Sequence, residues 1–213
     1  MFYETRNHHG LPHDPVKSCI VPRPIGWLTT VDGAGRVNLA PYSFFNGIAS
    51  DPPLVVVGIG GAPKPRDMKD TLANCRETGE FVASMATWDL REAMNLTSAA
   101  VPAEVDELAM VGLTPAPSTL VAPPRVAESP IHLECKVHDI LDMPCNDPAS
   151  RNTLVIGHVV GIHIDDSVLT DGLVDMAKVR PIARLGYMDY TVVNEVFTMH
   201  RPTAEQALRG AAE

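Results

Sequence analysis

The chain has 213 residues, of which 45% are hydrophobic and 20% are charged, a composition typical of a globular protein that can bury a sizeable core. Its 17 Lys and Arg against 26 Asp and Glu give a formal net charge of −9, which argues against binding to nucleic acid or to an anionic membrane surface. Because the sequence shows no secretory signal and no apolar run near the ~20 residues of a membrane helix, we expect a soluble, cytoplasmic protein with a single domain over residues 1–213.

The first 20 residues are rich in His, Pro and Asp, which predicts an extended N-terminal arm. His8, His9 and His13 lie in this arm and could ligate a metal, but solvated histidines are the favoured interpretation. The four cysteines are scattered without the spacing of a zinc site, and we expect them to be reduced thiols. No metal site is therefore predicted. The cysteines are Cys19, Cys75, Cys135 and Cys145.

Two strand-like runs at residues 25–31 and 36–39 flank the turn sequence Asp32-Gly33-Ala34-Gly35, and together they predict a β-hairpin. Pro41 follows the second run and cannot donate a hydrogen bond to a sheet. The second strand should therefore end, bulge or lie along a sheet edge at this point.

Residues 54–59 and 80–85 are apolar and of strand length, as expected for the interior of a barrel or a covered sheet. Between them, residues 70–79 begin with capping residues and end in Gly79, which predicts a short helix. Further helices are predicted at residues 90–96, where Asp89 and Glu92 have the spacing of a capping box, and at residues 105–111, before Gly112.

Residues 131–138 and 153–164 predict two more strands, and the proline-rich stretch 114–130 and the polar stretch 142–152 predict surface loops. The resulting order is rich in strands, with a few short helices and no alternation of strand and helix. We therefore predict a mainly β protein, a β-barrel with helical additions.

Common catalytic motifs are missing. The sequence has no G-x-S-x-G, P-loop, H-E-x-x-H or G-x-G-x-x-G, and Gly58-Ile59-Gly60-Gly61 leads toward Pro63 where a dinucleotide fold needs a helix. Ser43 could be a nucleophile, but no His or acid can be paired with it from the sequence.

Three groups of residues suggest the parts of a flavin mononucleotide site. Lys69, Asp70 and Thr71 at the start of the predicted helix could hold a phosphate, although an ordinary helix cap explains them as well. The other two groups could contact a polyol chain and a planar ring, or could belong to the core. They comprise Ser43 and Asn46 for the polyol, Trp27, Phe44 and Phe45 for the ring face, and Thr29 and Thr30 for the ring edge.

Longer stretches of the sequence resemble a known family. They are PRPIGWLTTVDGAGRVNLAPYSFFNGIASDPPLVV at residues 22–56 and KDTLANCRETGEFV at residues 69–82, followed by EAMNLTSA, HLEC and RPIARLGYMDY. Together they resemble the flavin reductase-like, FMN-binding split-barrel family, which includes flavoredoxin and the reductase components of two-component monooxygenases. The resemblance covers residues 11–190; the tail from residue 194 to 213 has no counterpart, and residues 58–66 form a variable loop.

The resemblance implies a homodimeric split barrel that binds FMN and takes a hydride from NADH or NADPH, passing from the nicotinamide C4 to the flavin N5. It also implies a partner oxygenase that receives reduced flavin or, alternatively, an electron carrier of flavoredoxin type with little NAD(P)H activity. Trp27, Thr29 and Thr30 would line the ring, residues 43–46 would contact ring and ribityl chain, and residues 69–71 would approach the phosphate. His132 and Arg184 resemble positions near the flavin or the nicotinamide in relatives, and they are the candidate catalytic residues.

Overall fold

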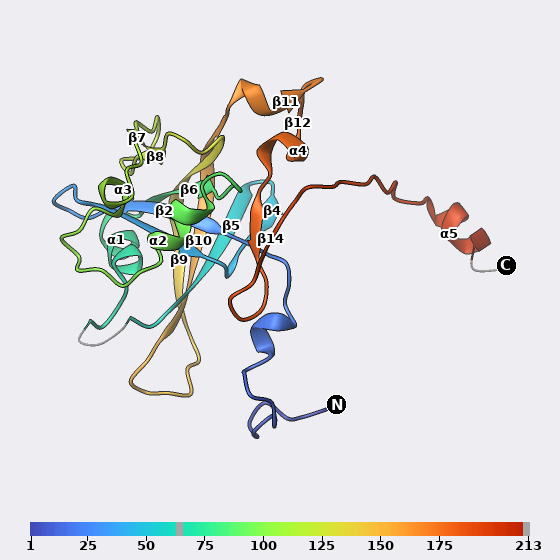
Figure 1. Cartoon of the computed structure of the whole chain (residues 1–213), viewed down its shortest axis with the longest axis horizontal. Helices are drawn as coiled ribbons and strands as arrows, with labels where there is room; N and C mark the ends of the chain where they lie inside the picture. The colour runs from blue at the N-terminus through green and yellow to red at the C-terminus, as the bar shows by residue number, and fades with distance from the viewer. Residues whose placement is uncertain (63–65, 211–213) are drawn as a thin grey trace.

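The computed structural model describes residues 1–62 and 66–210, and its centre is a curved antiparallel sheet of seven strands. The strand order is β3-β2-β6-β9-β10-β5-β4, and Figure 1 shows how strongly the sheet coils. The sequence-based prediction of a mainly β protein with a few short helices is confirmed. The strands are β2 (Gly26–Val31), β3 (Val37–Tyr42), β4 (Phe45–Ser50), β5 (Pro53–Gly60), β6 (Glu80–Met85), β9 (Ile131–Met143) and β10 (Asn152–Ile164).

The predicted hairpin is formed by β2 and β3, which pair with Trp27 opposite Pro41. Gly35 in the turn has φ +82°, a conformation that glycine adopts without steric cost. Pro41 lies inside β3, which is an outer strand of the sheet, so its missing N–H removes no bond from a central ladder. Of the three predicted outcomes at Pro41, the edge strand is the one that occurs.

The three predicted helices are present, with differences at their ends. α1 (Asp70–Thr78) ends as predicted at Gly79, which has φ +71° and donates its N–H to the Cys75 carbonyl at 3.1 Å. α2 (Arg91–Leu96) lacks the predicted capping box, because its N-cap residue is Leu90 and makes no side-chain cap bond. α3 (Glu107–Met110) is shorter than predicted, and Asp106 caps it.

Two buried clusters lie on opposite faces of β2. Leu28 packs in one cluster with Leu72 of α1 and with Phe81 and Val57 of the sheet. Trp27 packs in the other cluster, whose members include Met94 of α2 and Leu108 of α3. Because both faces are covered, all six residues of β2 are buried.

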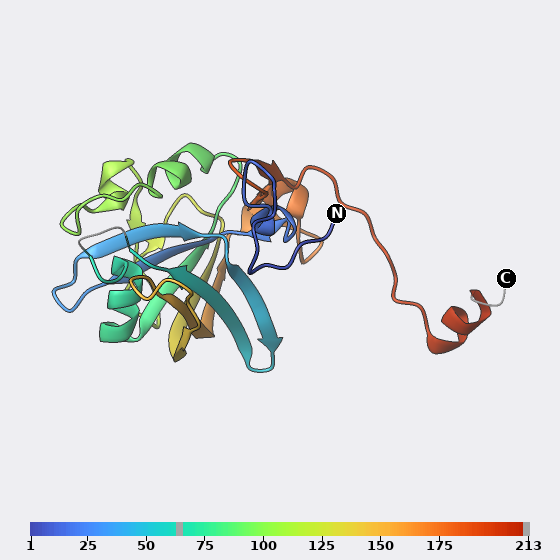
Figure 2. The same ribbon diagram turned by 90° about the horizontal axis from the view of Figure 1, so that it is seen from below.

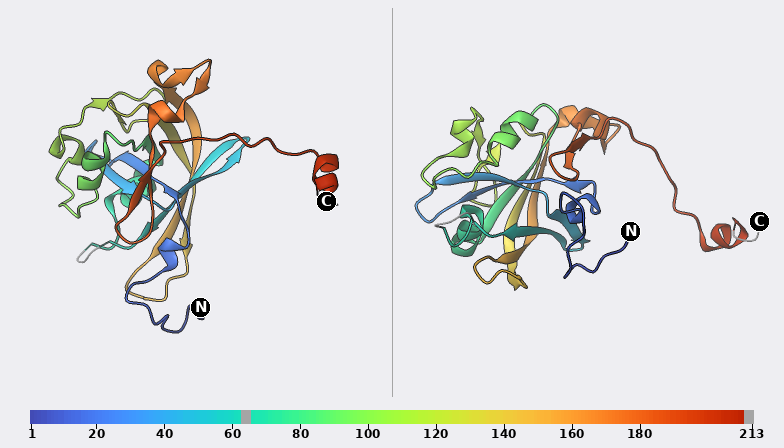
Figure 3. Two further views of the ribbon diagram at one scale, coloured as in Figure 1. Left: turned by 45° about the vertical axis from the view of Figure 1, so that its right-hand side comes forward. Right: turned by 60° about the horizontal axis from the view of Figure 1, so that its bottom comes forward.

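A small sheet joins a strand near the N-terminus to two strands late in the sequence. Its strands β1 (Arg23–Pro24), β13 (Ile182–Arg184) and β14 (Tyr190–Val192) bring the N-terminal segment against the β13–β14 turn. Residues 1–20, predicted as an extended arm, contain only the short 3-10 helix η1 (Val16–Ser18). Figure 2 shows the chain after β14 running away from the sheet to α5 (Ala204–Gly210), and the two views of Figure 3 agree.

The remaining elements lie outside the main sheet. They are β7 (Pro115–Ala116), β8 (Arg125–Val126), η2 (Asp166–Val168), β11 (Leu169–Thr170), β12 (Leu173–Val174) and α4 (Met176–Val179). In the described ranges, no helix has both the length and the apolar character needed to cross a membrane.

Candidate functional site

Two adjoining cavities form a groove beside β3. The first, about 170 Å³, lies between β3, the start of α1 and residues 97–101, and the second, about 280 Å³, lies between the N-terminal segment and the β13–β14 turn. Pro41 and Ser98 line both cavities, so the two spaces adjoin at these residues. We call the pair the β3 groove, or the groove. Its lining includes Asn38, Tyr42, Arg66, Lys69, Asp70 and Thr71 at one end and Lys17, Arg23, Ser43, Arg184, Tyr187 and Tyr190 at the other.

Lys69, Asp70 and Thr71 all line the first cavity. The Lys69 ammonium lies 5.3 Å from the centre of the Tyr42 ring, and burial, then the charge of Lys17, lowers the pKa of Lys69. Asp70 is neutralised by an ion pair with Arg66. Among the described residues, no carboxylate lies within 4.0 Å of Lys69, so its charge is available to a ligand.

A buried polar network holds the start of α1 against the sheet. Asn38 donates from Nδ2 to the Thr71 hydroxyl at 2.9 Å, and Asn74 donates to the Thr30 hydroxyl at 3.0 Å. Asn38 also reaches Thr30, at 3.3 Å. Thr30 has no exposed surface, and it is a shared partner of the two amides that position α1. The structure therefore does not bring the Thr30 side chain to the groove.

Trp27 and Thr29 are also fully buried, and their side chains are used inside the protein. The indole N–H of Trp27 donates to the Thr97 hydroxyl at 2.9 Å, and Thr97 lines the first cavity. The Thr29 hydroxyl donates to the Pro124 carbonyl at 2.5 Å. Both side chains lie behind the groove, where they fix the segments that follow α2 and precede β8.

The predicted residues 43–46 separate in the structure. Ser43 lines the second cavity, and its hydroxyl accepts a bond from Arg23 Nε at 3.3 Å. Phe44 is 49% exposed, and Arg23 lies 5.8 Å from its ring centre. Phe45 packs on the barrel core and lines a different, apolar cavity, whereas Asn46 is exposed on β4.

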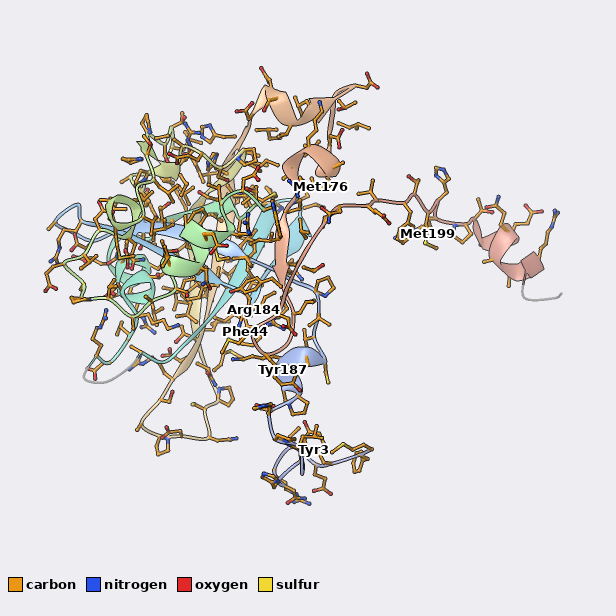
Figure 4. The ribbon with its side chains drawn as sticks, in the orientation of Figure 1. Tyr3, Phe44, Met176, Arg184, Tyr187 and Met199 are labelled. Carbon is orange, nitrogen blue, oxygen red and sulfur yellow. The ribbon has the colours of Figure 1, made fainter. Side chains whose placement is uncertain are left out.

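Arg184 lines the second cavity and also a third cavity of about 570 Å³. Its guanidinium lies 4.4 Å from the centre of the Tyr190 ring and donates to the Tyr190 hydroxyl and to the Tyr187 carbonyl at 2.5 Å. Figure 4 labels Arg184 and Tyr187 in this part of the molecule. The structure thus places one of the two candidate catalytic residues at the groove.

His132 lies elsewhere. It is 3% exposed, its Nε2 lies 2.8 Å from the Val126 carbonyl, and its ring stands edge-on to the ring of His163. Burial lowers the pKa of His132 to about 4. His132 lines none of the three cavities at and beside the groove.

Some residues of the groove were not predicted. Asn38 belongs to the stretch at residues 22–56 that resembles the family. Its residue type alone does not show whether its amide is buried and orients a helix or lies on the surface. Lys17 lies in the segment interpreted as an arm, and Arg23 follows that segment. Arg23 meets Arg184 only through the pairing of β1 with β13, which short-range sequence does not reveal. In the described part of the chain, no group of three or more His, Cys, Asp or Glu could hold a metal.

Comparison with known proteins identifies the class. The family described as "Flavin reductase like domain" matches residues 18–183. A protein of Halalkalibacterium halodurans is 38% identical over 187 residues, which cover 88% of this chain and 89% of that protein. The chain therefore belongs to the flavin reductase-like family.

Solved structures agree with this assignment. Nitrilotriacetate monooxygenase component B from Bacillus cereus is 30% identical, with a TM-score of 0.80 over 91% of this chain and all of that one. The 2-nitrobenzoate 2-nitroreductase of Pseudomonas fluorescens is 29% identical, with a TM-score of 0.77 over 89% of each chain. Flavoredoxin of Desulfovibrio vulgaris is 25% identical, with a TM-score of 0.73 over 84% of this chain and 91% of that one.

The fold is the split barrel. A structure from Shewanella frigidimarina with a split barrel domain shares it at a TM-score of 0.76. In this chain, the sheet has β3 at one end of its strand order and β4 at the other, and no described ladder joins these two strands.

Proposed function

We propose that this protein is an NAD(P)H-dependent FMN oxidoreductase that passes reduced flavin to a partner oxygenase. The observation that supports this proposal most is Lys69, which lines the groove at the start of α1, is half-buried and has no carboxylate partner among the described residues. The chain also belongs to the flavin reductase-like family. The similarity to a monooxygenase component B supports the partner oxygenase.

The cation and the hydrogen-bond donors along the groove fit FMN. Lys69 supplies one cation, and the first turn of α1 supplies backbone N–H groups that have no partner inside the helix, a combination suited to a phosphate. Beyond Pro41, the groove continues to Ser43, which offers a hydroxyl to the rest of the molecule. Bound FMN would supply the hydride-accepting chemistry.

In this proposal, the residues of the protein bind FMN and hold its site in place. Thr30, Asn38 and Asn74 hold α1 in place, so that Lys69 and Thr71 form a phosphate site before the ligand binds. Trp27 holds the segment after α2 through Thr97. We propose these indirect roles for Trp27 and Thr30 because both side chains are fully buried.

Glu107 lines the same cavity as Lys69, and its carboxylate accepts a bond from the Leu39 N–H at 2.9 Å. Burial raises the pKa of Glu107.

The alternative is an FMN-binding electron carrier with little NAD(P)H activity, which the similarity to flavoredoxin favours. Anaerobic mixing of the FMN-loaded protein with NADH or NADPH distinguishes the two. Rapid bleaching of the flavin band is the result that we expect. Bleaching only by dithionite or by a reduced protein donor would contradict the oxidoreductase and support the carrier.

The resemblance also implies a homodimer, which we retain in the proposal. Light scattering on the FMN-loaded protein should give a mass of about twice the 23.0 kDa of the chain. A monomeric mass at working concentration would contradict this part of the proposal.

A further inference from the structure

Positive charge is concentrated between the N-terminal segment and the β13–β14 turn. Lys17, Arg23 and Arg184 line the second cavity of the groove, and no Asp or Glu lines it. The whole chain has a formal charge of −9, so this cavity reverses the charge balance of the molecule. Among the described residues, none of the three cations has a carboxylate within 4.0 Å.

Two of these cations are forced together by the fold. Arg23 and Arg184 stand opposite each other where β1 pairs with β13. Arg23 is only 5% exposed, and its guanidinium is held by carbonyls that include Ile20 at 2.8 Å and Leu185 at 2.9 Å. Burial, and then the charge of Arg184, lowers the pKa of Arg23. Like charges in this position repel each other, and a bound anion would relieve the repulsion.

Arg184 lies where the second cavity meets the third. Met94 and Tyr190 also line both spaces, so the third cavity adjoins the groove at these residues. The third cavity is lined by Trp88, and the Arg91 guanidinium lies 4.1 Å from the centre of one of its rings. At about 570 Å³, this cavity has room for a planar ring and a sugar beside aromatic surface.

Lys69 and Arg184 lie at different ends of the groove. Lys69 lines only the first cavity, and Arg184 lines only the second and third. The first end contains acids, Asp70 and Glu107, beside its cations, whereas the second has cations alone. The groove therefore presents cations in both of its cavities, Lys69 in the first and Lys17, Arg23 and Arg184 in the second, whereas FMN carries one phosphate.

We propose that Arg184, supported by Arg23 and Lys17, is a second anion site that binds the phosphates of the electron donor's adenine nucleotide, with the adenosine in the third cavity. A guanidinium suits this task because its planar donors match phosphate oxygens in pairs. The inference rests on the proposed function, since it assigns the site to the donor of that reaction.

Calorimetric titration of the FMN-loaded protein with ADP tests the site without any hydride transfer. Arg184→Gln keeps a donor for the Tyr187 carbonyl but removes the charge, and we expect it to weaken ADP binding about tenfold. Arg184→Lys should recover part of this loss. The control Arg76→Ala removes a surface guanidinium that pairs with Asp142, and it should bind ADP as the wild type does. Added NaCl should weaken ADP binding less in Arg184→Gln than in the wild type.

Equal ADP affinity in the wild type and Arg184→Gln would overturn the inference. So would a selective loss of FMN over riboflavin in Arg184→Gln, because that result would assign the cation to the flavin phosphate. Should Arg184→Gln not fold, Lys17→Gln provides the same test, since Lys17 is exposed on the short helix η1. If ADP binding depends on Arg184 but NADH and NADPH do not bleach the bound flavin, the oxidoreductase proposal alone is refuted. If the flavin is bleached but ADP binding does not depend on Arg184, the anion site alone is refuted.

Discussion

Removal of the Lys69 charge should weaken FMN binding far more than riboflavin binding. The Lys69 ammonium is half-buried and has no carboxylate partner among the described residues, so a phosphate would become its main charged contact. A hydrogen bond to a charged group contributes about 2 kcal/mol, which corresponds to about a 30-fold change in the dissociation constant. We therefore expect Lys69→Ala to raise the FMN dissociation constant about 30-fold and to leave that of riboflavin within about a factor of two.

Quenching of flavin fluorescence, measured for both ligands on the apoprotein, supplies the two dissociation constants. Lys136→Ala is the matched control, because Lys136 is exposed on β9 and lines none of the described cavities. Equal weakening of FMN and riboflavin in Lys69→Ala would refute the phosphate contact. Unchanged binding of both ligands would remove Lys69 from the site altogether.

Three further results are expected. Gly157→Ala should lower the free energy of unfolding in urea by about 1 to 3 kcal/mol, because the added Cβ would stand 2.4 Å from Phe81, whereas Gly60→Ala meets open space and should change it little. Burial lowers the pKa of His132 to about 4, against about 6.5 in an unfolded chain. Since the unfolded chain binds the proton more tightly, stability should fall as pH drops from about 6.5 to 4, by up to about 3 kcal/mol, and His132→Gln should flatten this dependence in denaturation curves. Ellman's reagent should label only the two exposed thiols in the native protein and all four after denaturation, and four fast native thiols would contradict the buried placement of the other two. The exposed thiols belong to Cys19 and Cys145, and the buried ones to Cys75 and Cys135.

Local signals predicted the elements that border the first cavity of the groove. The helix predicted over residues 70–79 ends at Gly79, and the hairpin before it turns at residues 32–35. Both elements could therefore be predicted from short-range sequence. Lys69, Asp70 and Thr71 all line the first cavity, and their contact with a phosphate stays a prediction.

Burial of β2 could not be predicted in the same way. Trp27 and Thr29 are residue types that suit both a ligand surface and a strand interior, and only the packing of α1 on one face and of α2 and α3 on the other decides between them. β4 was missed because residues 45–50 show no alternation of buried and exposed positions, and five of the six are exposed.

The cluster of Lys17, Arg23 and Arg184 depends on contacts distant in sequence. Arg23 and Arg184 are opposite each other only because β1 pairs with β13, across most of the chain. The N-terminal segment was interpreted as a free arm, yet its Ser18 packs so tightly on Gly186 that a Cβ there would lie 1.9 Å from the Ser18 hydroxyl. Pairing of this kind leaves no short-range pattern in the sequence.

A crystal structure of the FMN complex tests the central claim most directly. The account predicts the flavin phosphate beside Lys69 and the first turn of α1, with the ring system reaching past Pro41 toward Ser43. A phosphate bound instead at Arg184, or a flavin outside the groove, would contradict it.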